Sequence, residues 1–339
     1  MKKTLALLLL TALLITPLTG CNTTDENEPD DTVATTDNVP EYNAADANPA
    51  SDFEYKVGED GGITITKYIG TDTDVVIPEK IDGKDVTVIG NYVFSYLYKS
   101  QVVSLDMPDT VKVIEDGAFM HNKELKTVRL SKALEAINTS AFEGCAKLST
   151  IQLPQTLIKI GMRSFLECAS LKVIKIPKSV TVWHSESFAL SGLETIELEE
   201  GLTVLGATAF GGTNICRIEI PGSIKVIPSG VFGLCDNLVT VILNEGIERI
   251  EIQAFRRNTR LTEIVIPSTV TVCSEFAFIE CDTLKSVKFE GNAPSEFKNQ
   301  DAELEKLIGS SRIPFTIYYH EGAEGFTTPE WNGYKTEIR

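Results

Sequence analysis

A phenylalanine recurs at nearly constant spacing along most of this chain. Successive copies are 22 to 25 residues apart, and five of the eight intervals are 23 residues. A period this constant indicates a stack of equivalent supersecondary units, none of which can bury its apolar face without its neighbours. The sequence therefore predicts a solenoid. The nine copies are Phe94, Phe119, Phe142, Phe165, Phe188, Phe210, Phe232, Phe255 and Phe278.

A short alternating segment follows each phenylalanine. Two aliphatic residues separated by one variable residue stand about nine and eleven positions later. This alternation is typical of a short half-buried strand whose aliphatic side chains point inward. The pairs are Val128 and Leu130, Ile151 and Leu153, Ile174 and Ile176, Ile196 and Leu198, Ile218 and Ile220, Val241 and Leu243, and Ile264 and Ile266. Proline follows many of them, where it can end a strand without removing a hydrogen bond from its middle.

Two more aliphatic residues precede the next phenylalanine, as Leu157 and Ile160 precede Phe165. Each unit thus directs apolar side chains inward from several points along one turn of the chain. We therefore predict an α/β or mainly β repeat solenoid of about ten coils, with a short parallel strand in each coil. The repeats are expected to occupy residues 73–290.

The repeat resembles that of the BspA-like, or Treponema pallidum-type, leucine-rich repeat family. The matching pattern reads Leu148-x-x-Ile151-x-Leu153-Pro154-x-x-Leu157-x-x-Ile160-Gly161-x-x-Ser164-Phe165-x-x-Cys168. The resemblance covers Asp74 to about Glu290 and implies a right-handed leucine-rich-repeat solenoid. The family is associated with display on cell surfaces and, in a few members, with adhesion to host or microbial surfaces. Because the ligand of most members is unknown, the resemblance implies a class of role and no binding residue.

The N-terminus has the features of an export signal, assigned to residues 1–20. Lys2 and Lys3 precede an apolar run from Leu5 to Ile15, which is too short to span a bilayer. The run ends in Leu18-Thr19-Gly20-Cys21, which resembles a bacterial lipobox. The resemblance implies lipidation of Cys21 and an anchor on the extracellular face of a bacterial membrane. The alternative is an ordinary cleaved signal with a chance cysteine.

Residues 21–52 are expected to form an acidic, disordered tether behind the lipidated cysteine. From Asn22 to Asp52 the chain has nine acidic residues and no lysine or arginine, so it has too little apolar surface to order itself. Next come two alternating runs, 53–57 and 63–68, around an Asp-Gly-Gly turn. They predict a β-hairpin, and we expect residues 53–72 to cover the first coil.

Residues 291–339 are expected to form a last repeat and a C-terminal cap. Asp301 to Ile308 predicts a short helix, and Phe315 to Tyr319 predicts a last strand. Phe326, Trp331 and Tyr334 lie among glycines. We expect these aromatic residues to cover the end of the core, because an uncapped stack exposes apolar surface. The alternative is a platform on which a sugar stacks.

Charge and motif content exclude several functions. From Phe53 onward the chain has 39 acidic and 29 basic residues, a net charge of −10, which argues against nucleic acid as a partner. The three histidines are scattered, and no phosphate loop or zinc motif accompanies them. Trp183 occupies the core position of Ile160, and His184 a turn position. We predict no catalytic residues, no cofactor and no metal.

Four cysteines share one repeat position, three residues after the phenylalanine: Cys145, Cys168, Cys235 and Cys281. The other copies have Asn122, Ser191, Thr213 and Asn258 there. This interchange predicts a small, buried, weakly polar position with reduced thiols, since a free cysteine behaves as a small buried hydrophobe. A disulfide between Cys145 and Cys168, in successive coils, remains an alternative in an exported protein.

The outward positions of the strands form the candidate ligand-binding face. The candidate residues are Arg129, Gln152, Lys175, Glu197, Glu219, Ile242 and Val265. They change along the chain from basic to acidic to apolar, which would suit a mixed-charge protein surface. The alternative is a solvated sheet face without a ligand. Glu197 beside Glu219 counts against that alternative, because like charges on neighbouring strands destabilise a sheet.

These observations predict a lipid-anchored binding module of the cell surface. Its partner is expected to be a protein or glycan on a host or microbial surface. The alternative is a structural or spacer protein of the cell envelope that has no high-affinity ligand.

Overall fold

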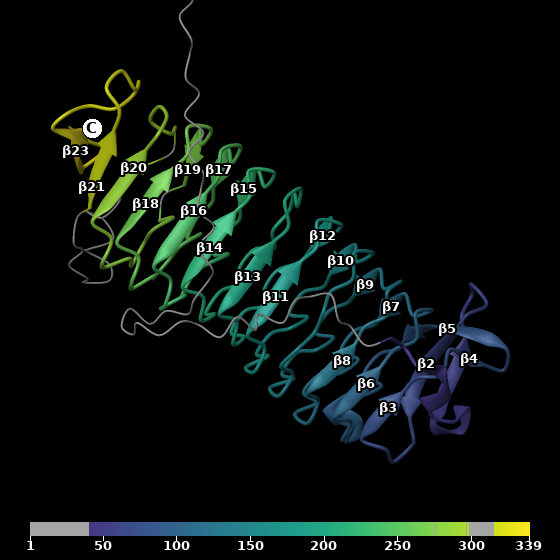
Figure 1. Cartoon of the computed structure of the whole chain (residues 1–339). Helices are drawn as coiled ribbons and strands as arrows, with labels where there is room; N and C mark the ends of the chain where they lie inside the picture. Colours follow the sequence, from purple (N-terminus) through teal and green to yellow (C-terminus); the bar gives the residue numbers. More distant parts are fainter. Residues whose placement is uncertain (1–40, 275, 296, 298–314) are drawn as a thin grey trace, which may run out of the picture. The chain divides into compact units, whose positions relative to one another are not determined.

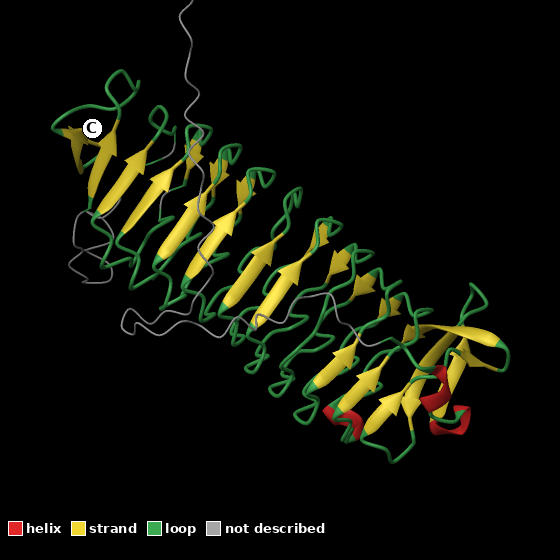
Figure 2. Ribbon diagram, viewed as in Figure 1, coloured by secondary structure: helices red, strands yellow, loops and turns green. Residues whose placement is uncertain are grey.

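The computed structural model describes residues 41–274, 276–295, 297 and 315–339. All of them belong to one compact unit, Thr35–Arg339. Its strands lie in two columns, and the coils follow one another in chain order (Figure 1). The helices of the described residues are three short 3-10 segments, drawn red in Figure 2: η1 (Ala44–Asp46), η2 (Ala50–Asp52) and η3 (Tyr96–Tyr98). The solenoid is therefore mainly β.

The first column contains the strands predicted after the phenylalanines, except the one predicted at Ile151 and Leu153, where only an isolated bridge joins Thr150 to Thr127. Paired strands are parallel and in register, so that Val173 stands opposite Thr195 and Lys175 opposite Glu197. The inward residues are buried, as the alternation predicts, with Ile174 1% exposed and Ile176 fully covered. The strands are β3 (Asp74–Val76), β6 (Ser104–Asp106), β8 (Thr127–Arg129), β11 (Val173–Ile176), β13 (Thr195–Leu198), β14 (Arg217–Ile220), β16 (Thr240–Leu243), β18 (Glu263–Ile266), β20 (Ser286–Phe289), β21 (Thr316–Tyr319) and β23 (Tyr334–Ile338).

A second column of strands, which the sequence analysis did not predict, precedes the phenylalanines. Most of its strands have two residues, too few for an alternation to be recognised in the sequence. Each contains the second of the two aliphatic core positions, as β10 contains Ile160. The strands are β5 (Lys84–Ile89), β7 (Val113–Ile114), β9 (Ala136–Ile137), β10 (Lys159–Ile160), β12 (Val182–Trp183), β15 (Val226–Ile227), β17 (Arg249–Ile250) and β19 (Val272–Cys273).

The repeated phenylalanines form a continuous stack through the core. Adjacent rings are nearly parallel, with centroids 4.8 to 5.8 Å apart from Phe94 to Phe278. The rings are at most 3% exposed. Burial of one such ring stabilises the fold by about 1.5–3 kcal/mol, and ring contact adds about 0.5–1.5 kcal/mol. The period of the sequence is thus the spacing of this stack.

The turn around each phenylalanine is bonded to the next coil. Around Phe119, the amides of Gly117, Phe119 and His121 donate to the following coil at 2.9, 2.7 and 2.6 Å. The two amides between them donate within their own coil. This alternation requires positive φ on both sides of the ring, 61° at Gly117 and 54° at His121. The turns are therefore held together by a ladder of hydrogen bonds, much as the strands are.

Large side chains at these positive-φ positions cover glycines in the next coil. The His121 ring lies over Gly144, so that a Cβ on that glycine would stand 2.0 Å from Nδ1. The side chain of Leu190 covers Gly212 in the same way, with Cδ2 2.6 Å from the position of such a Cβ. Gly144 is required both by its φ of 69° and by its neighbour.

The hydrogen-bonded columns are interrupted together at one coil. In the first column β13 pairs with β11 and β14 pairs with β16, while in the second column one sheet ends at β12 and the next begins at β15. Within the described ranges no ladder joins β13 to β14 or β12 to β15. The neighbouring intervals between phenylalanines are the shortened ones, 22 residues each. The phenylalanine stack continues across this interruption, since Phe188 and Phe210 are 5.6 Å apart.

The repeat position shared by the four cysteines is buried, as predicted. Cys145 and Cys168 are free thiols with no exposed surface, and no disulfide joins them. Each thiol donates to the carbonyl oxygen of a phenylalanine in the preceding coil, at 3.1 and 3.2 Å. Asn258 makes the same contact through Nδ2 at 3.1 Å, and Ser191 donates to the phenylalanine of its own coil at 2.7 Å. Cysteine, asparagine and serine therefore interchange because each can donate to these carbonyl groups.

The N-terminal segment 41–52 departs from the predicted disorder. Asn48 is 8% exposed, its amide donates to the Val76 carbonyl at 2.9 Å, and its Oδ1 accepts from the Val76 amide at 2.8 Å. The carbonyl and amide groups of Val76, on the open edge of β3, thus both have a hydrogen-bond partner, which explains why this polar segment is ordered. The predicted tether over residues 21–52 is therefore too long by at least residues 41–52. Residues 1–40, with the predicted export signal and Cys21, lie outside the described residues.

The expected hairpin consists of β1 (Phe53–Val57) and β2 (Ile63–Tyr68), which pair antiparallel. Strand β2 also pairs in parallel with β5, so the hairpin extends the second column. The ring centroid of Tyr68 lies 5.6 Å from that of Phe94 and 5.4 Å from that of Phe53. These contacts continue the aromatic stack to the N-terminal end. A further short strand, β4 (Lys80–Ile81), pairs with β5.

At the C-terminal end, the expected last strand is β21, which pairs with β20 and β23. Strand β22 (Glu330–Trp331) turns back antiparallel onto β23. Trp331 is 8% exposed and stacks on Phe297 at 5.7 Å, while Phe326 is half-buried. These contacts agree with covering of the last coil, because the indole faces other aromatic rings. The helix predicted from Asp301 to Ile308 lies outside the described residues.

Candidate functional site

Six of the seven candidate residues lie on the outer side of the first column, and we call them the strand face. Gln152, Glu197, Glu219 and Val265 are exposed, and Lys175 and Ile242 are half-buried. The register places Lys175 opposite Glu197, and Glu219 opposite Ile242. The strands that carry five of these residues follow one another in the first column (Figure 1), and Gln152 lies in the coil between β8 and β11.

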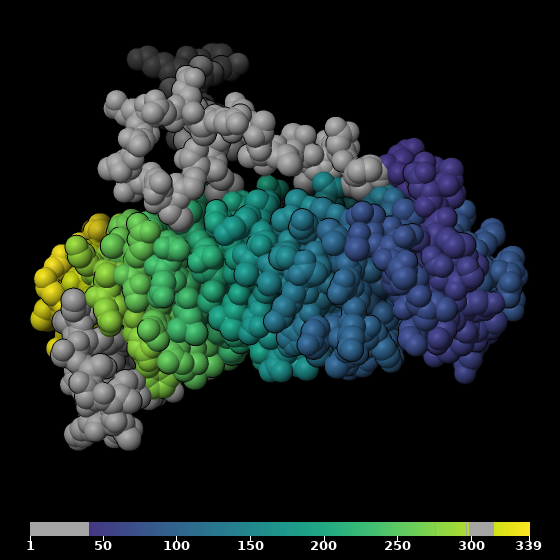
Figure 3. All heavy atoms as spheres, turned by 90° about the horizontal axis from the view of Figure 1, so that it is seen from below, coloured from purple at the N-terminus to yellow at the C-terminus, as the bar shows by residue number. Residues whose placement is uncertain are grey.

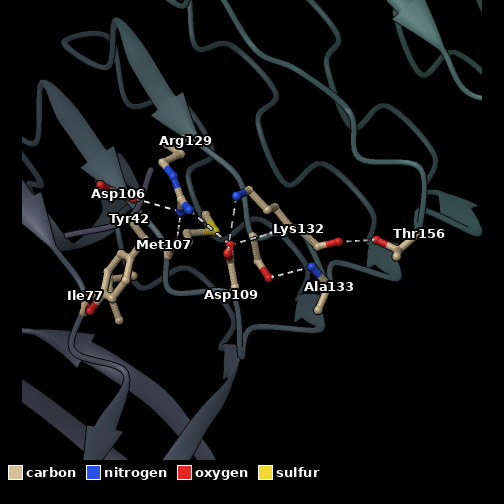
Figure 4. Close-up of polar contacts among 10 residues, drawn as sticks. Tyr42, Ile77, Asp106, Met107, Asp109, Arg129, Lys132, Ala133 and Thr156 are labelled. Atoms are coloured by element: carbon tan, nitrogen blue, oxygen red, sulfur yellow. Dashed lines mark hydrogen bonds and ion pairs between the residues drawn. The ribbon is translucent and has the colours of Figure 1, made fainter. Parts of the chain in front are cut away.

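Arg129, the seventh candidate, is not available for a ligand. It is 9% exposed, and its guanidinium donates to Asp106 at 3.0 Å, to Asp109 at 3.1 Å and to the Met107 carbonyl (Figure 4). The Tyr42 ring covers it, with its centroid 5.6 Å from the guanidinium carbon. The prediction that Arg129 contacts a ligand was wrong, because acceptors from segment 106–109 of the preceding coil and the Tyr42 ring enclose the side chain.

Lysine and arginine on the outer side of the first column are paired with acids. Lys175 lies 3.5 Å from Glu199, Arg217 3.6 Å from Glu219, and Lys288 2.8 Å from Glu263. Exposed pairs of this kind stabilise a protein by about 0–1 kcal/mol, so their main effect here is on surface charge. They remove the basic part of the expected basic-to-acidic gradient.

Glu197 and Glu219 are not the ladder neighbours that the sequence suggested. They lie on β13 and β14, on the two sides of the interruption. The argument that their repulsion counts against a bland surface therefore fails. Glu197 is exposed, and no lysine or arginine lies within ion-pair distance of it among residues 41–274, 276–295 and 315–339.

Apolar side chains adjoin this acidic part of the strand face. Val239 is 40% exposed, Val265 is 39% exposed, and Ile242 is half-buried. Val239 immediately precedes β16, which contains Ile242, and Val265 lies on β18 in the following coil. The outward surface of these coils thus combines carboxylates with exposed apolar groups.

A polar hollow of about 370 Å³ lies where the N-terminal segment meets the turns after the first column. Glu41, Tyr42, Glu79, Asp109, Thr110 and Lys132 line it. Tyr42 closes one side by donating to the Ile77 carbonyl at 2.7 Å, and Asp109 accepts from the Lys132 amide at 3.0 Å (Figure 4). The sequence analysis missed this hollow. In the sequence, the residue that could have indicated it is Tyr42, the sole aromatic residue between Asn22 and Asp52.

The histidines and Trp183 have separate surroundings. His121 covers Gly144, His184 is exposed, and Nε2 of His320 lies 2.6 Å from Glu290. Trp183 is in the core, as predicted, where its Nε1 donates to Ser187 at 2.5 Å. In the described part of the chain, no group of three histidine, cysteine, aspartate or glutamate side chains is placed to hold a metal ion. No helix found there has the length and apolarity to cross a membrane.

These stacked parallel strands, with a buried repeat inside and variable residues outside, define a repeat solenoid with an extended outer face. A family model described as the BspA type leucine rich repeat region matches residues 87–214 and 184–300, with six copies. The chain belongs to this family, which confirms the resemblance found in the sequence. The family is one of repeat proteins, and the absence of enzymatic activity stays a prediction.

Solved structures of leucine-rich repeat proteins are similar to this chain. The T. pallidum leucine-rich repeat protein is 27% identical, with a TM-score of 0.49, over 63% of this chain and 90% of that one. The pneumococcal vaccine antigen PcpA is 20% identical, with a TM-score of 0.42, over 80% and 92%. A leucine-rich cell surface protein from Faecalibacterium prausnitzii is 21% identical, with a TM-score of 0.33, over 75% and 96%. A search among curated proteins finds no match.

Proposed function

We propose that this protein is a lipid-anchored binding module of a bacterial cell surface, and that its strand face contacts a protein or glycan on a host or microbial surface. The observation that carries the proposal is the group Glu219, Val239, Ile242 and Val265, which joins a carboxylate to exposed and half-buried apolar side chains on neighbouring coils. Interfaces typically combine an apolar centre with a polar rim. The family supports a surface role, since it is associated with cell-surface display.

The scaffold suits such a role because its outward side chains are held before binding. The inward neighbours of these residues are buried, with Ile220 and Ile266 fully covered and Val241 8% exposed. Binding to a prearranged surface avoids the entropic cost of ordering that surface. A protein partner with basic groups would complement Glu197 and Glu219.

The anchor is part of this proposal and rests on the sequence alone. The lipobox Leu18 to Cys21 and the charged, apolar segment before it support lipidation of Cys21. Detergent phase partitioning of membranes from the native host tests it. Wild-type protein is expected in the detergent phase and Cys21→Ser in the aqueous phase, and equal partitioning of the two would contradict the anchor.

Binding is tested with an array of surface proteins and glycans, probed with the chain from Asn22 onward. This fragment retains the whole compact unit Thr35–Arg339. A bound ligand is expected to be lost in the double variant Ile242→Asp, Val265→Asp. The matched control is Val182→Asp, Val226→Asp, which changes two valines exposed by 42% and 41% on the second column. Equal loss in both variants would contradict a role of the strand face.

The second candidate function is a spacer of the cell envelope without a high-affinity ligand. The paired charges on the outer strands favour it, because they leave few free basic groups there. Wild-type protein that binds no member of such an array would support the spacer and overturn the binding module.

A further inference from the structure

The first repeat carries an exposed apolar turn that has no equivalent in the other described coils. Tyr96, Leu97 and Tyr98 form the 3-10 helix η3 and are 66%, 64% and 52% exposed. The interval from Phe94 to Phe119 is 25 residues, so this coil has two extra residues compared with most repeats. We call these three residues the aromatic knob.

The exposure of the knob is a fixed feature of the fold. The Tyr96 amide donates to the Met120 carbonyl in the next coil at 3.0 Å, and the Lys99 amide closes the helix on the Tyr96 carbonyl at 2.8 Å. Ser95, immediately before the helix, is fully buried. None of the three knob residues is buried, so their side chains do not contribute to the core.

The geometry of the knob favours insertion over stacking. Successive side chains in a 3-10 helix point about 120° apart. The two tyrosines and the leucine therefore project in three directions, and they do not form the flat platform on which a sugar ring would lie. A protruding group of this kind fits a soft apolar medium, such as the boundary region of a bilayer, where tyrosine is enriched.

Three exposed lysines lie in the coil of the knob and in the next coil. Lys99 follows the helix, and its neighbour Ser100 accepts a hydrogen bond from Asn122 at 3.4 Å, which brings Lys123 close. The Lys126 amide donates to the Val103 carbonyl of the same region at 2.8 Å. In the part of the chain that the structure describes, none of these three ammonium groups has a carboxylate within 4.0 Å. This local positive charge contrasts with the net charge of −10 from Phe53 onward.

We propose that the aromatic knob and these three lysines dock the N-terminal coils onto an anionic lipid membrane. The tyrosines and the leucine enter the headgroup boundary, and Lys99, Lys123 and Lys126 meet the lipid phosphates. The inference rests on the proposed function, because it assumes that Cys21 holds the chain at that membrane. Charge complementarity favours the lipid surface over a protein pocket.

The position of the knob is within reach of the anchor. The N-terminal segment meets the end of β3, where Tyr42 bonds to the Ile77 carbonyl. The knob lies near the start of β6, where Val103 bonds to the Thr73 carbonyl (Figures 1 and 2). The length of β3 between these points is about 13 Å. Twenty residues separate Cys21 from Glu41, and no chain of that length can extend beyond about 70 Å, so the proposed anchor would keep the knob close to the membrane.

The test uses flotation of the chain from Asn22 onward with phosphatidylcholine vesicles, with and without phosphatidylglycerol. This fragment lacks the lipid, so binding reports the knob alone. We expect binding that increases with phosphatidylglycerol. The triple variant Tyr96→Ser, Leu97→Ser, Tyr98→Ser is expected to lower it by about tenfold or more. Replacing Lys99, Lys123 and Lys126 with glutamine should remove the dependence on phosphatidylglycerol, at about fivefold per lysine.

The control variant is Leu190→Ser, Leu234→Ser, which removes two apolar side chains 55% and 42% exposed on other coils and should leave vesicle binding unchanged. No vesicle binding by the wild-type fragment overturns the inference, as does equal binding by the knob variant. Binding of the knob to a soluble protein or glycan in place of vesicles also overturns it. Failure here is distinct from failure of the proposed function, which is measured with the strand-face variants.

Discussion

The thiol of Cys145 donates a hydrogen bond to the carbonyl oxygen of Phe119 in the preceding coil, at a distance of 3.1 Å. This contact connects the most regular feature of the sequence, the phenylalanine, with the position where cysteine replaces asparagine, serine and threonine. The side chain at this position therefore links successive coils through a main-chain acceptor.

At this position serine should be a more stable replacement for cysteine than alanine. Cys145→Ser keeps a donor for the nearby carbonyl groups, whereas Cys145→Ala loses it, so the serine variant is expected to be more stable by about 1 kcal/mol. Cys273 is the control, because its buried thiol has no hydrogen-bond partner within the described residues. There alanine should be the better replacement. Urea denaturation of the four variants checks this, and a more stable Cys145→Ala would count against the hydrogen bond.

The buried thiols should resist alkylation in the folded protein. Burial raises the pKa of the Cys235 thiol to about 11, and it also raises the pKa of Cys145, Cys168 and Cys273. Because the thiolate is the reactive form, iodoacetamide is expected to modify Cys216, which is half-buried, well before these four. Peptide mass spectrometry after brief labelling measures the order. Rapid native labelling of Cys168 would refute it.

The contact between His121 and Gly144 predicts a coupled pair of substitutions. Gly144→Ala should destabilise the protein by about 2–4 kcal/mol, since the new Cβ meets the imidazole and the backbone has positive φ. Gly83→Ala, with a φ of 73° and open space around it, should cost only the backbone term of about 1–2 kcal/mol. Adding His121→Ala to Gly144→Ala should recover most of the difference. Additive effects in thermal denaturation would show that the two residues are independent.

Arg129 should act as a structural residue. Arg129→Met leaves Asp106 partly buried without its partner and is expected to cost about 3 kcal/mol near neutral pH. Arg129→Lys should not restore stability, because a lysine cannot reach two carboxylates and a carbonyl at once.

The effect of Arg129→Met should depend on pH. Burial raises the pKa of Asp106, and the Arg129 guanidinium opposes this rise. Without the arginine the pKa rises further in the folded state only, so the folded protein binds the proton more tightly than the unfolded chain. The variant is therefore expected to lose stability as pH rises through that raised pKa and to regain part of it in mild acid. Denaturation of wild type and variant across the acid range measures this, and a constant difference would disprove it.

At the C-terminal end, the stability lost on replacing Glu290 should have the opposite dependence on pH. Hydrogen bonds from His320 and Arg339 lower the pKa of this carboxyl group. A lowered folded-state pKa adds stability that is present above the unfolded pKa and is lost as pH falls through the folded value. Glu290→Gln should therefore destabilise the protein slightly at neutral pH and not at low pH. Glu337→Gln, which removes an exposed pair with Lys335, is the control.

The interior of the solenoid could be predicted from the sequence because each core residue repeats. The positions of Phe142, Ile151 and Ile160 are fixed by a period that nine copies share, and all three are buried. The repeat period could not predict the burial of Arg129. Its burial depends on Asp109 and on Tyr42, which come from different turns and have no counterparts in the other coils.

Other features were missed because they are too short or too polar to form a pattern. The two-residue strands of the second column show no alternation, although they contain predicted core residues such as Ile160. Segment 41–52 has the composition of a disordered chain, yet Asn48 completes the edge of β3. For the candidate site, exposure could be expected from the alternation, whereas the pairing of Lys175 with Glu199 depends on the conformation of a turn.

The joint interruption of both strand columns has a mechanical consequence. Elsewhere along the described coils at least one column continues as a strand ladder. Across this interruption the coils are joined by the turn ladder, by single hydrogen bonds such as that from Ser223 to the Leu202 carbonyl, and by the packing of Phe188 and Trp183 on Phe210. A repeat array unfolds where the coupling between neighbours is weakest. If the proposed anchor and partner pull on the protein, extension should begin at this coil, so that the N-terminal and C-terminal halves yield as separate units. On the face seen from below, the packed surface is nevertheless continuous along these coils (Figure 3).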